Sequence, residues 1–341
     1  MSRKLLSYTA LGLILGNAAI ADVPKVAVDI APVHSLVSRV MEGVGSPKLI
    51  IPAGASPHEY SLRPSEAKSL QDADMVIWMG EDLAPWMENS IEKLAKNAEV
   101  ITLLEASETK LLDFREGALF EEHDHGDHDD HDDHDDHDKD HDDHDDHDDH
   151  DKDHDDHDDH DDHDDHAGHD HGEHDPHAWL SIENAQTWLN LVAGKLSAAD
   201  PENAGVYFGN AAAARSEIEE LSKEVNSILD PVRGRSFVVF HDAYQYFETS
   251  FDFPASGAIS LGDATDPSAS RIAEIQGRVR EEGINCVLSE PQYNPNLVET
   301  VLEGTDAKTG VIDPLGVNLE PGSKLYGDLI RNMAKSLAGC L

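Results

Sequence analysis

The segment from Glu121 to Asp175 holds the densest concentration of metal-binding side chains in this chain. It repeats the triplet His-Asp-Asp and contains 18 of the 22 histidines and 31 of the 70 acidic residues. Imidazole nitrogen and carboxylate oxygen are ligands that zinc and other borderline divalent metals prefer. Because this tract has almost nothing apolar to bury, we expect it to be disordered. It can collect metal, but a selective site must be built elsewhere in the chain.

The histidines near the two ends of the tract are predicted to be secondary, weak metal-capture residues. They are His123, His125, His128, His131, His166, His169, His171 and His174. The tract could pass captured metal to a selective site, buffer or sense excess metal, or serve only as a solubilising spacer. A spacer does not need a histidine at every third position. Because imidazole binds metal only when neutral, loading should fail as the pH falls through roughly 6.5.

Four histidines lie outside the tract, and three of them are predicted to form the selective site. His58 follows a predicted strand, His177 lies where the tract rejoins the fold, and His241 ends another predicted strand. Open α/β sheets bind ligands at the carboxyl ends of their strands. Three neutral imidazoles with a fourth position left to water or oxygen make a zinc-type shell. Any one histidine could instead be a local hydrogen-bonding residue, but three beside a metal-attracting tract favour a shared site.

An oxygen ligand could complete this shell. Asp313 ends the last predicted strand and is the candidate fourth ligand, although a carboxylate at a strand end is often only a turn former. Asp242 is expected to orient a neighbouring histidine by a hydrogen bond, and Glu59 is expected to face away from the site. His34 begins the first predicted helix, where we expect it to cap the helix or line the cleft rather than bind metal.

The three-imidazole shell also indicates the metal. It suits zinc, copper or nickel, whereas manganese prefers oxygen-rich shells. An exported copper site would more often include Met or Cys, and none is suitably placed here. We therefore predict one tight Zn²⁺ site in the body of the protein and weaker sites on the tract.

These ligands must be positioned by the elements around the tract, where short apolar strands alternate with helical patterns. This alternation predicts parallel sheets with crossover helices. We expect strands at 26–30, 48–51, 75–79, 100–104, 237–240, 255–259, 286–288 and 310–312. We expect helices at 34–41, 65–72, 85–96, 182–196, about 201–229, 268–281, 296–302 and 324–337.

The predicted fold class is therefore α/β, with two parallel-sheet lobes joined by a single long helix and a metal cleft between the lobes. The predicted organisation is a signal peptide at 1–21, an N-terminal lobe at 22–200, a connecting helix at 201–230 and a C-terminal lobe at 231–341. The disordered His/Asp-rich loop at 121–175 is inserted in the first lobe.

The amino terminus has the pattern of a secretory signal. Arg3 and Lys4 precede an apolar stretch at 5–15, and Ala19-Ile20-Ala21 is a small-x-small cleavage site. The alternative, a membrane anchor, would need roughly 20 apolar residues. We expect a soluble, exported, periplasmic protein. Because Cys286 and Cys340 are the two cysteines of an exported chain, they most often form a disulfide, and their spacing is a poor match to a Cys metal site.

The charge of the chain narrows the class of partner. The formal net charge is −45, of which the tract carries 2 − 31 = −29, so the remainder is an ordinary acidic protein. A polyanion repels nucleic acid and anionic membrane surfaces, so neither is expected as a partner.

Three segments together resemble a known family. Gly54 to Tyr60 reads Gly-Ala-Ser-Pro-His-Glu-Tyr, Asp175 to Leu180 reads Asp-Pro-His-Ala-Trp-Leu, and Phe240 to Tyr244 reads Phe-His-Asp-Ala-Tyr. With the acidic His-rich loop before the second segment, the mature chain is similar to the zinc-uptake substrate-binding proteins of bacterial ABC transporters, the ZnuA type.

The resemblance implies two α/β lobes on a rigid helix, one zinc in the cleft, and delivery to an inner-membrane ABC permease with its ATPase. It implies His58, His177 and His241 as ligands and a Cys286–Cys340 disulfide. Some zinc members have a Glu ligand directly before the first histidine, whereas this chain has Pro57. The fourth ligand would then be Asp313, as in related manganese members, or water.

We expect a monomer without catalytic activity, and two other functions are considered. The first is a periplasmic zinc buffer or metallochaperone, which would not require a bilobal body. The second is a zinc hydrolase, which would need a bound water and a positioned general base. The sequence has no His-Glu-x-x-His motif and no nucleophile elbow, so transport is the preferred prediction.

Overall fold

The computed structural model describes residues 23–115, 120, 174–260, 267–293 and 295–341. The predicted signal peptide and all the predicted capture histidines except His174 lie outside the described residues. The predicted boundaries between lobes and connecting helix remain predictions.

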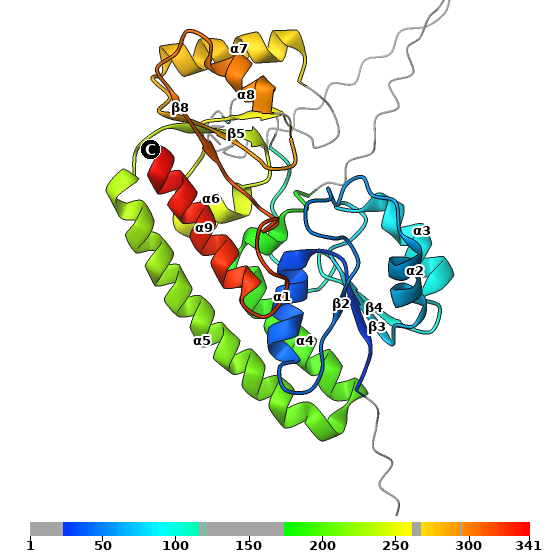
Figure 1. Ribbon diagram of the computed structural model, residues 1–341. Helices are drawn as coiled ribbons and strands as arrows, with labels where there is room; N and C mark the ends of the chain where they lie inside the picture. Colours follow the sequence, from blue (N-terminus) through cyan, green and yellow to red (C-terminus); the bar gives the residue numbers. More distant parts are fainter. Residues whose placement is uncertain (1–22, 116–119, 121–173, 261–266, 294) are drawn as a thin grey trace, which may run out of the picture. The chain divides into compact units, whose positions relative to one another are not determined.

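The first half of the fold is a four-stranded parallel sheet with the order β2-β1-β3-β4. Its strands are β1 (Val26–Val28), β2 (Lys48–Leu49), β3 (Met75–Trp78) and β4 (Glu99–Thr102). The connecting helices are α1 (Ala31–Val40), α2 (Pro64–Gln71) and α3 (Pro85–Leu94) (Figure 1). Each connection joins parallel strands through a helix, as the alternating pattern predicted.

The second half repeats this topology with the order β6-β5-β7-β8. Its strands are β5 (Phe237–His241), β6 (Ala258–Ser260), β7 (Cys286–Ser289) and β8 (Lys308–Val311). Its helices are α6 (Gln245–Phe251), α7 (Ala269–Glu281) and α8 (Pro295–Leu302). The chain leaves β5 toward β6 on one side and returns to β7 on the other, so the ends of β5 and β7 form a switch point where such sheets bind ligands.

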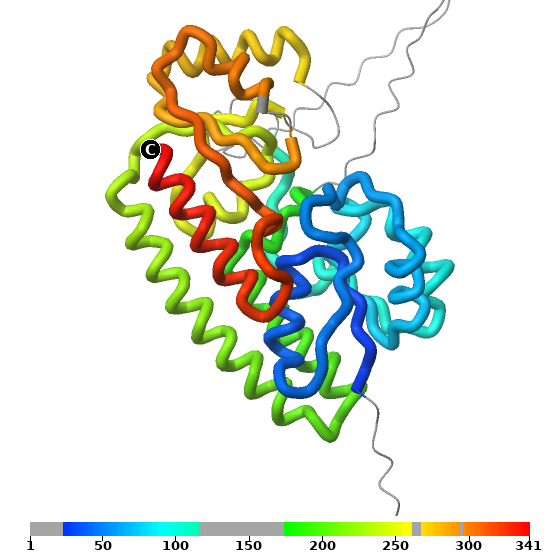
Figure 2. Tube along the Cα trace, in the orientation of Figure 1, coloured from blue at the N-terminus to red at the C-terminus, as the bar shows by residue number. Residues whose placement is uncertain are grey.

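Three further helices lie outside these two strand–helix repeats and pack against one another: α4 (Ile182–Ala199), α5 (Ala204–Leu229) and α9 (Leu325–Cys340). Helix α5 buries one stripe of residues spaced three or four apart, from Tyr207 to Leu229, as an amphipathic helix must. It packs against α4, α9 and α1. Figure 2 shows the C-terminal helix beside the first helix of the chain, where Tyr326 N donates to Ser35 Oγ at 2.9 Å.

The core explains how β5 presents its last residue. Successive side chains of a strand point to opposite faces. Phe237 and Val239 accordingly belong to the large core shared with α5 and α9, whereas Val238 and Phe240 belong to a second cluster under α7 and α8. His241 follows the alternation of Phe237 and Val239, so it continues the inner face of the strand.

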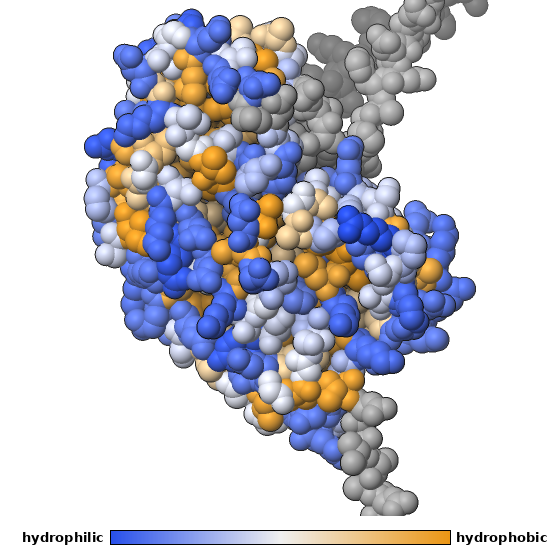
Figure 3. Space-filling view, in the orientation of Figure 1, coloured by the Kyte–Doolittle hydropathy of each residue, from blue (hydrophilic) through white to orange (hydrophobic). Residues whose placement is uncertain are grey.

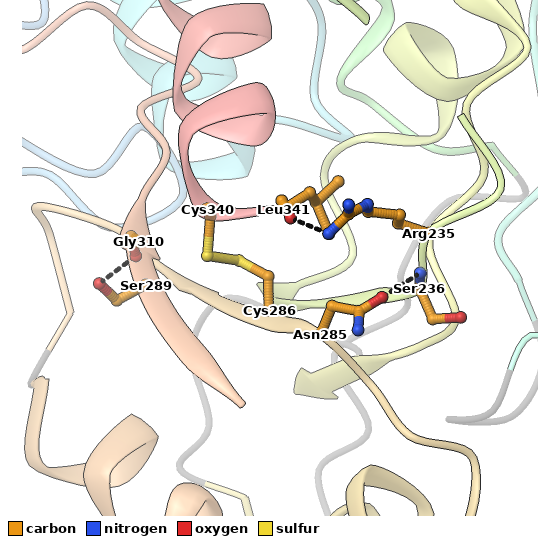
Figure 4. The surroundings of a disulfide bond; sticks show 8 residues. All are labelled: Arg235, Ser236, Asn285, Cys286, Ser289, Gly310, Cys340 and Leu341. Atoms are coloured by element: carbon orange, nitrogen blue, oxygen red, sulfur yellow. Dashed lines mark hydrogen bonds between the residues drawn. A yellow bond between two sulfur atoms is a disulfide. The ribbon is translucent and has the colours of Figure 1, made fainter. Parts of the chain in front are cut away.

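The disulfide between Cys286 of β7 and Cys340 of α9 is present in the structure (Figure 4). It fastens the end of α9 to the second sheet. Gly310 of β8 lies against it, and a Cβ at that position would stand 3.1 Å from Cys340 Cβ and 3.2 Å from its Sγ. The close approach of β8 to the disulfide therefore requires a residue without a side chain.

The predicted fold class is confirmed, with differences at particular elements. Helix α6 was not predicted, because seven residues rich in aromatic side chains give a weak helical pattern. Strand β6 begins at Ala258 instead of 255, because Gly257 is a residue that strands disfavour. Strand β8 begins at Lys308 instead of 310, because an edge strand tolerates polar residues that the apolar pattern does not detect.

The surface shows few large hydrophobic side chains. Figure 3 shows a face that is largely hydrophilic, with small separate hydrophobic areas. The large hydrophobics that are exposed among the described residues are Val100, Val206, Phe208 and Val311. Within the same described ranges, no helix is both long and apolar enough to span a membrane.

Candidate metal centre

The three predicted ligand histidines lie next to one another in the structure. His58 comes from the loop after β2, His177 directly precedes a short 3₁₀ helix at Ala178–Leu180, and His241 is the last residue of β5. The ring centre of His177 is 5.5 Å from that of His58 and 5.3 Å from that of His241. His177 is therefore the middle member of the group.

These separations fit a shared zinc ion. An imidazole nitrogen binds zinc at about 2.0–2.1 Å. With the ring centre roughly 1.1 Å farther out, two rings on one tetrahedral ion have their centres about 5 Å apart. Among the described residues, no group of three or more His, Cys, Asp or Glu side chains is already arranged to hold a metal. The spacing of the ring centres is therefore the feature that fits one shared zinc ion.

A small pocket contains the three rings. It has a volume of about 20 Å³, which is room for an ion or one water molecule. Its lining residues come from the loops that follow strands of both sheets and from the segment around His177. They are Ser56, Pro57, His58, His177, Trp179, His241, Glu290, Gln292, Tyr293, Pro314 and Leu315. A pocket of this size and composition suits a bare cation better than an organic ligand.

Two of the histidines are oriented by buried carboxylates. His177 Nδ1 lies 2.7 Å from Asp175 Oδ1, and His241 Nδ1 lies 2.5 Å from Glu290 Oε1. An ionised carboxylate only accepts, so each Nδ1 must carry the hydrogen, and in the neutral imidazole the lone pair is then on Nε2. This is the arrangement in which outer carboxylates fix the tautomer of metal-binding histidines.

His58 is held through its backbone. Its N–H donates to Ser56 Oγ at 3.3 Å, and Trp86 Nε1 donates to the carbonyl of the preceding Pro57 at 2.8 Å. His58 is only partly buried, unlike His177 and His241. The loop that carries it therefore contributes the more exposed ligand candidate.

Asp313 stands beside the pocket. Its Oδ1 accepts from the N–H groups of Leu315 and Gly316, and its Oδ2 accepts from that of Val317. In this conformation Asp313 forms the turn whose neighbours Pro314 and Leu315 line the pocket. Coordination of a metal by Asp313 remains a prediction. It would have to use a carboxylate lone pair that does not accept one of these three N–H groups.

That Asp242 orients a neighbouring histidine stays a prediction, and the structure gives this residue another partner. Asp175 and Glu290 hold His177 and His241, whereas both oxygens of Asp242 bind the guanidinium of Arg115. Glu59 is exposed, as expected. His34 is buried away from the pocket, with Nε2 3.3 Å from the Pro47 carbonyl, and burial lowers its pKa.

Arg115 and Glu248 were missed by the sequence analysis. Arg115 also binds Glu248, with Nη1 2.7 Å from Oε2 and Nη2 3.1 Å from Oε1. Burial raises the pKa of the Asp242 and Glu248 carboxyls, and the Arg115 charge opposes that rise. Nothing in the sequence signalled this cluster, because a lone Arg before an acidic tract looks like a surface residue. Glu290 was detectable, since it directly follows β7 in the way that Asp313 follows β8.

His174 is the one predicted capture histidine that the structure describes. It forms an isolated antiparallel bridge with Asp113, and its Nδ1 lies 2.9 Å from Asp113 Oδ1. The two ends of the tract are thus paired as they leave the fold.

Comparisons with known proteins point in one direction. A family model described as the periplasmic component A of the zinc-uptake complex, ZnuA, matches residues 26–340. The chain is 44% identical over 339 residues to the high-affinity zinc uptake system protein ZnuA of Paracoccus denitrificans, covering 98% of each chain. It is 44% identical over 326 residues to that of Brucella abortus, covering 96% of this chain and 94% of the relative.

A solved structure is similar at the level of the fold. It is described as a crystal structure of ZnuA, and it superimposes with a TM-score of 0.68 at 18% identity. The match covers 94% of this chain and 99% of the other.

Proposed function

Because the chain belongs to the ZnuA family of periplasmic zinc-uptake components, we propose that it captures Zn²⁺ with His58, His177 and His241. It is the zinc-binding component of a transporter. The observation that supports the ligand assignment is the spacing of the three rings, 5.5 and 5.3 Å from the central His177. This is close to the spacing expected on one tetrahedral zinc.

The proposed site binds zinc through neutral imidazoles. Nδ1 of His177 and of His241 is bound to a carboxylate. Zinc would therefore coordinate to the Nε2 atom of each of these rings. The carboxylates also make the imidazoles better ligands. For the fourth position we favour water over Asp313, because the Asp313 oxygens accept three backbone N–H groups.

The partners follow from the family. A zinc-uptake complex component delivers its ion to a membrane permease driven by an ATPase, and we propose that this chain does so as a monomer. Its family is periplasmic, and we propose that residues 1–21 are the signal peptide that exports it. We also propose that the tract histidines bind further zinc weakly and raise its concentration near the pocket.

A transport function also agrees with the carboxylates of the site. A zinc hydrolase needs a general base aimed at the metal-bound water. Asp175 and Glu290, which lie closest to the proposed ligands, are both engaged by histidine Nδ1 groups. Their geometry suits ligand orientation and not proton abstraction.

Zinc titration of the full chain against a competing chelator tests the ligand set. The chelator strips weakly bound zinc, so the measurement reports the tight site alone. Alanine variants of His58, His177 and His241 should each weaken that site by more than about 100-fold, beyond the effect of losing an outer partner. His34→Ala is the matched control and should leave the affinity unchanged. Equal affinities in all four variants would refute the assignment.

A further inference from the structure

Helix α6 makes a set of polar contacts just outside the proposed zinc site. The contacts reach the two short segments from which the tract leaves the fold, residues 112–115 and 174–175, here called the tract roots. The roots are joined to each other, since Asp175 N donates to the Leu112 carbonyl at 2.8 Å. The two roots are therefore held together, and the second one ends two residues before His177.

Arg115, in the first root, makes the largest number of these hydrogen bonds. Its guanidinium forms paired hydrogen bonds with both Asp242 and Glu248, and such forks fix geometry as well as charge. The Asp242 and Glu248 side chains are 4% and 5% exposed, and that of Arg115 is 17% exposed. The Phe120 ring covers the guanidinium at 3.5 Å. Asp242 directly follows His241, so the first root is bound to the strand end that carries a proposed ligand.

Two further residues of α6, Gln245 and Tyr246, bind both tract roots. Tyr246 OH donates to the Asp175 carbonyl and accepts from Leu112 N, both at 2.9 Å. The Gln245 amide nitrogen, in the orientation that satisfies both ends of the group, donates to Asp175 Oδ2 at 3.2 Å and to the Asp113 carbonyl at 3.1 Å. Asp175 Oδ1 meanwhile holds His177. The carboxylate that orients His177 is thus fixed from α6.

We propose that Arg115 is a positioning residue for zinc capture: by binding Asp242 and Glu248 it locks the tract roots to α6 and sets the spacing of His177 and His241 before zinc arrives. The proposal rests on the proposed function of these histidines as ligands. It divides the site into a prearranged pair, His177 and His241, and a third ligand, His58, that joins from the other sheet.

The test compares four full-length variants: Arg115→Ala, Arg115→Lys, Arg331→Ala and His58→Ala. Arg331 is the matched control, since its guanidinium also pairs with two carboxylates, Glu224 and Asp328, but on α5 and α9 away from the pocket. Zinc affinity is measured by chelator competition. Cobalt(II) alone is then bound to report the coordination geometry by its visible absorption, and thermal unfolding is recorded for each variant.

We expect Arg115→Ala to weaken the tight site about tenfold or more, the usual effect of losing an outer partner, and to alter the cobalt spectrum. Arg115→Lys should restore part of the affinity, because it keeps the charge without the fork. Arg331→Ala should change neither. If Arg115→Ala lowers only the unfolding temperature and leaves affinity and spectrum unchanged, Arg115 is purely structural and the proposal is overturned.

Two further outcomes separate this proposal from the ligand assignment. If His58→Ala weakens zinc binding and Arg115→Ala does not, only the positioning role fails. If His58→Ala has no effect, the ligand set itself is wrong. Should Arg115→Ala fail to fold, Glu248→Gln replaces it, because it removes one charge while keeping the shape. An affinity within twofold of the parent in that variant would reject the positioning role.

Discussion

At the end of the tract, His174 and His177 lie three residues apart, and each is paired with an aspartate. The first pair is exposed to solvent and the second is buried. In the pair at the root, the side chains of His174 and Asp113 are 35% and 85% exposed, with 2.9 Å between Nδ1 and Oδ1. In the pair at the pocket, the side chains of His177 and Asp175 are 5% and 2% exposed, with 2.7 Å between the same atoms. The chemical groups are the same, so burial and neighbours must distinguish capture from selective binding.

The difference has a physical cause. An exposed pair is hydrated, shares its carboxylate with water, and gains little from being held together. A buried pair has already lost its water, so the carboxylate holds the imidazole in one orientation before a metal arrives. In the proposed function, a histidine like His174 would bind zinc without this preparation, whereas His177 would bind it with its orientation already set.

The largest expected effect comes from removing one histidine of each pair. His177→Ala should weaken the tight zinc site by more than about 100-fold, because it removes the central ligand of the proposed shell, a larger loss than that of an outer partner. His174→Ala should leave the tight site within about threefold of the parent, since its partner is exposed and it lies outside the pocket lining. Chelator competition on both variants provides the measurement. A similar loss in the two would remove the distinction between root and pocket.

The orienting carboxylates should show the same contrast at a smaller scale. Asp175→Asn removes the charge that holds His177 Nδ1–H and should weaken tight zinc binding by about 10- to 100-fold. Glu290→Gln should do the same through His241. Asp113→Asn is the matched control at the root and should leave tight binding unchanged. Isothermal titration with zinc can rank the three, and an effect of Asp113→Asn equal to that of Asp175→Asn would contradict the argument.

Much of this site could be predicted from the sequence, for a reason that the residues make clear. His58 and His241 follow apolar strand patterns, and parallel strands bring their carboxyl ends to one edge. His177 was found by subtraction, because only four histidines lie outside the tract. These signals depend on local pattern and on topology, both of which are visible along the chain.

The positioning contacts could not be predicted in the same way. Arg115 and Glu248 are 133 residues apart, and neither shows a pattern that pairs it with the other. Helix α6 was missed because its stability comes from the burial of Tyr246, Phe247 and Phe251 and not from helix propensity. Asp242 was assigned to a histidine because it is adjacent to one, whereas its side chain binds Arg115. Sequence patterns predicted the candidate ligands, whereas tertiary packing decided which side chains contact them and their neighbours.

The pH dependence should separate tract from pocket further. Zinc binds neutral imidazole, so proton uptake competes with it and loading falls as the pH decreases. For exposed histidines with an ordinary pKa of roughly 6.5, about nine in ten are protonated at pH 5.5. The weak zinc should therefore be lost between about pH 7 and 5.5, while the tight zinc persists to lower pH because three imidazoles bound to one ion compete better with protons than single imidazoles do. Zinc counted after equilibrium dialysis at each pH measures both populations, and simultaneous loss would show that they are not distinct.

The smallest expected effect is that of removing the tract. Deleting 123–171 leaves both roots, including the His174–Asp113 bridge and the contacts of Arg115 and Tyr246 with α6 and its neighbours. A longer deletion to 174 would cut the second root and confuse loss of the tract with loss of the lock. Because the pocket is built from residues outside the deletion, the affinity of the tight site should stay within about threefold, whereas the weak zinc should disappear. Calorimetric titration resolves the two classes of site, and loss of the tight class in this variant would mean that the tract itself supplies ligands to the pocket.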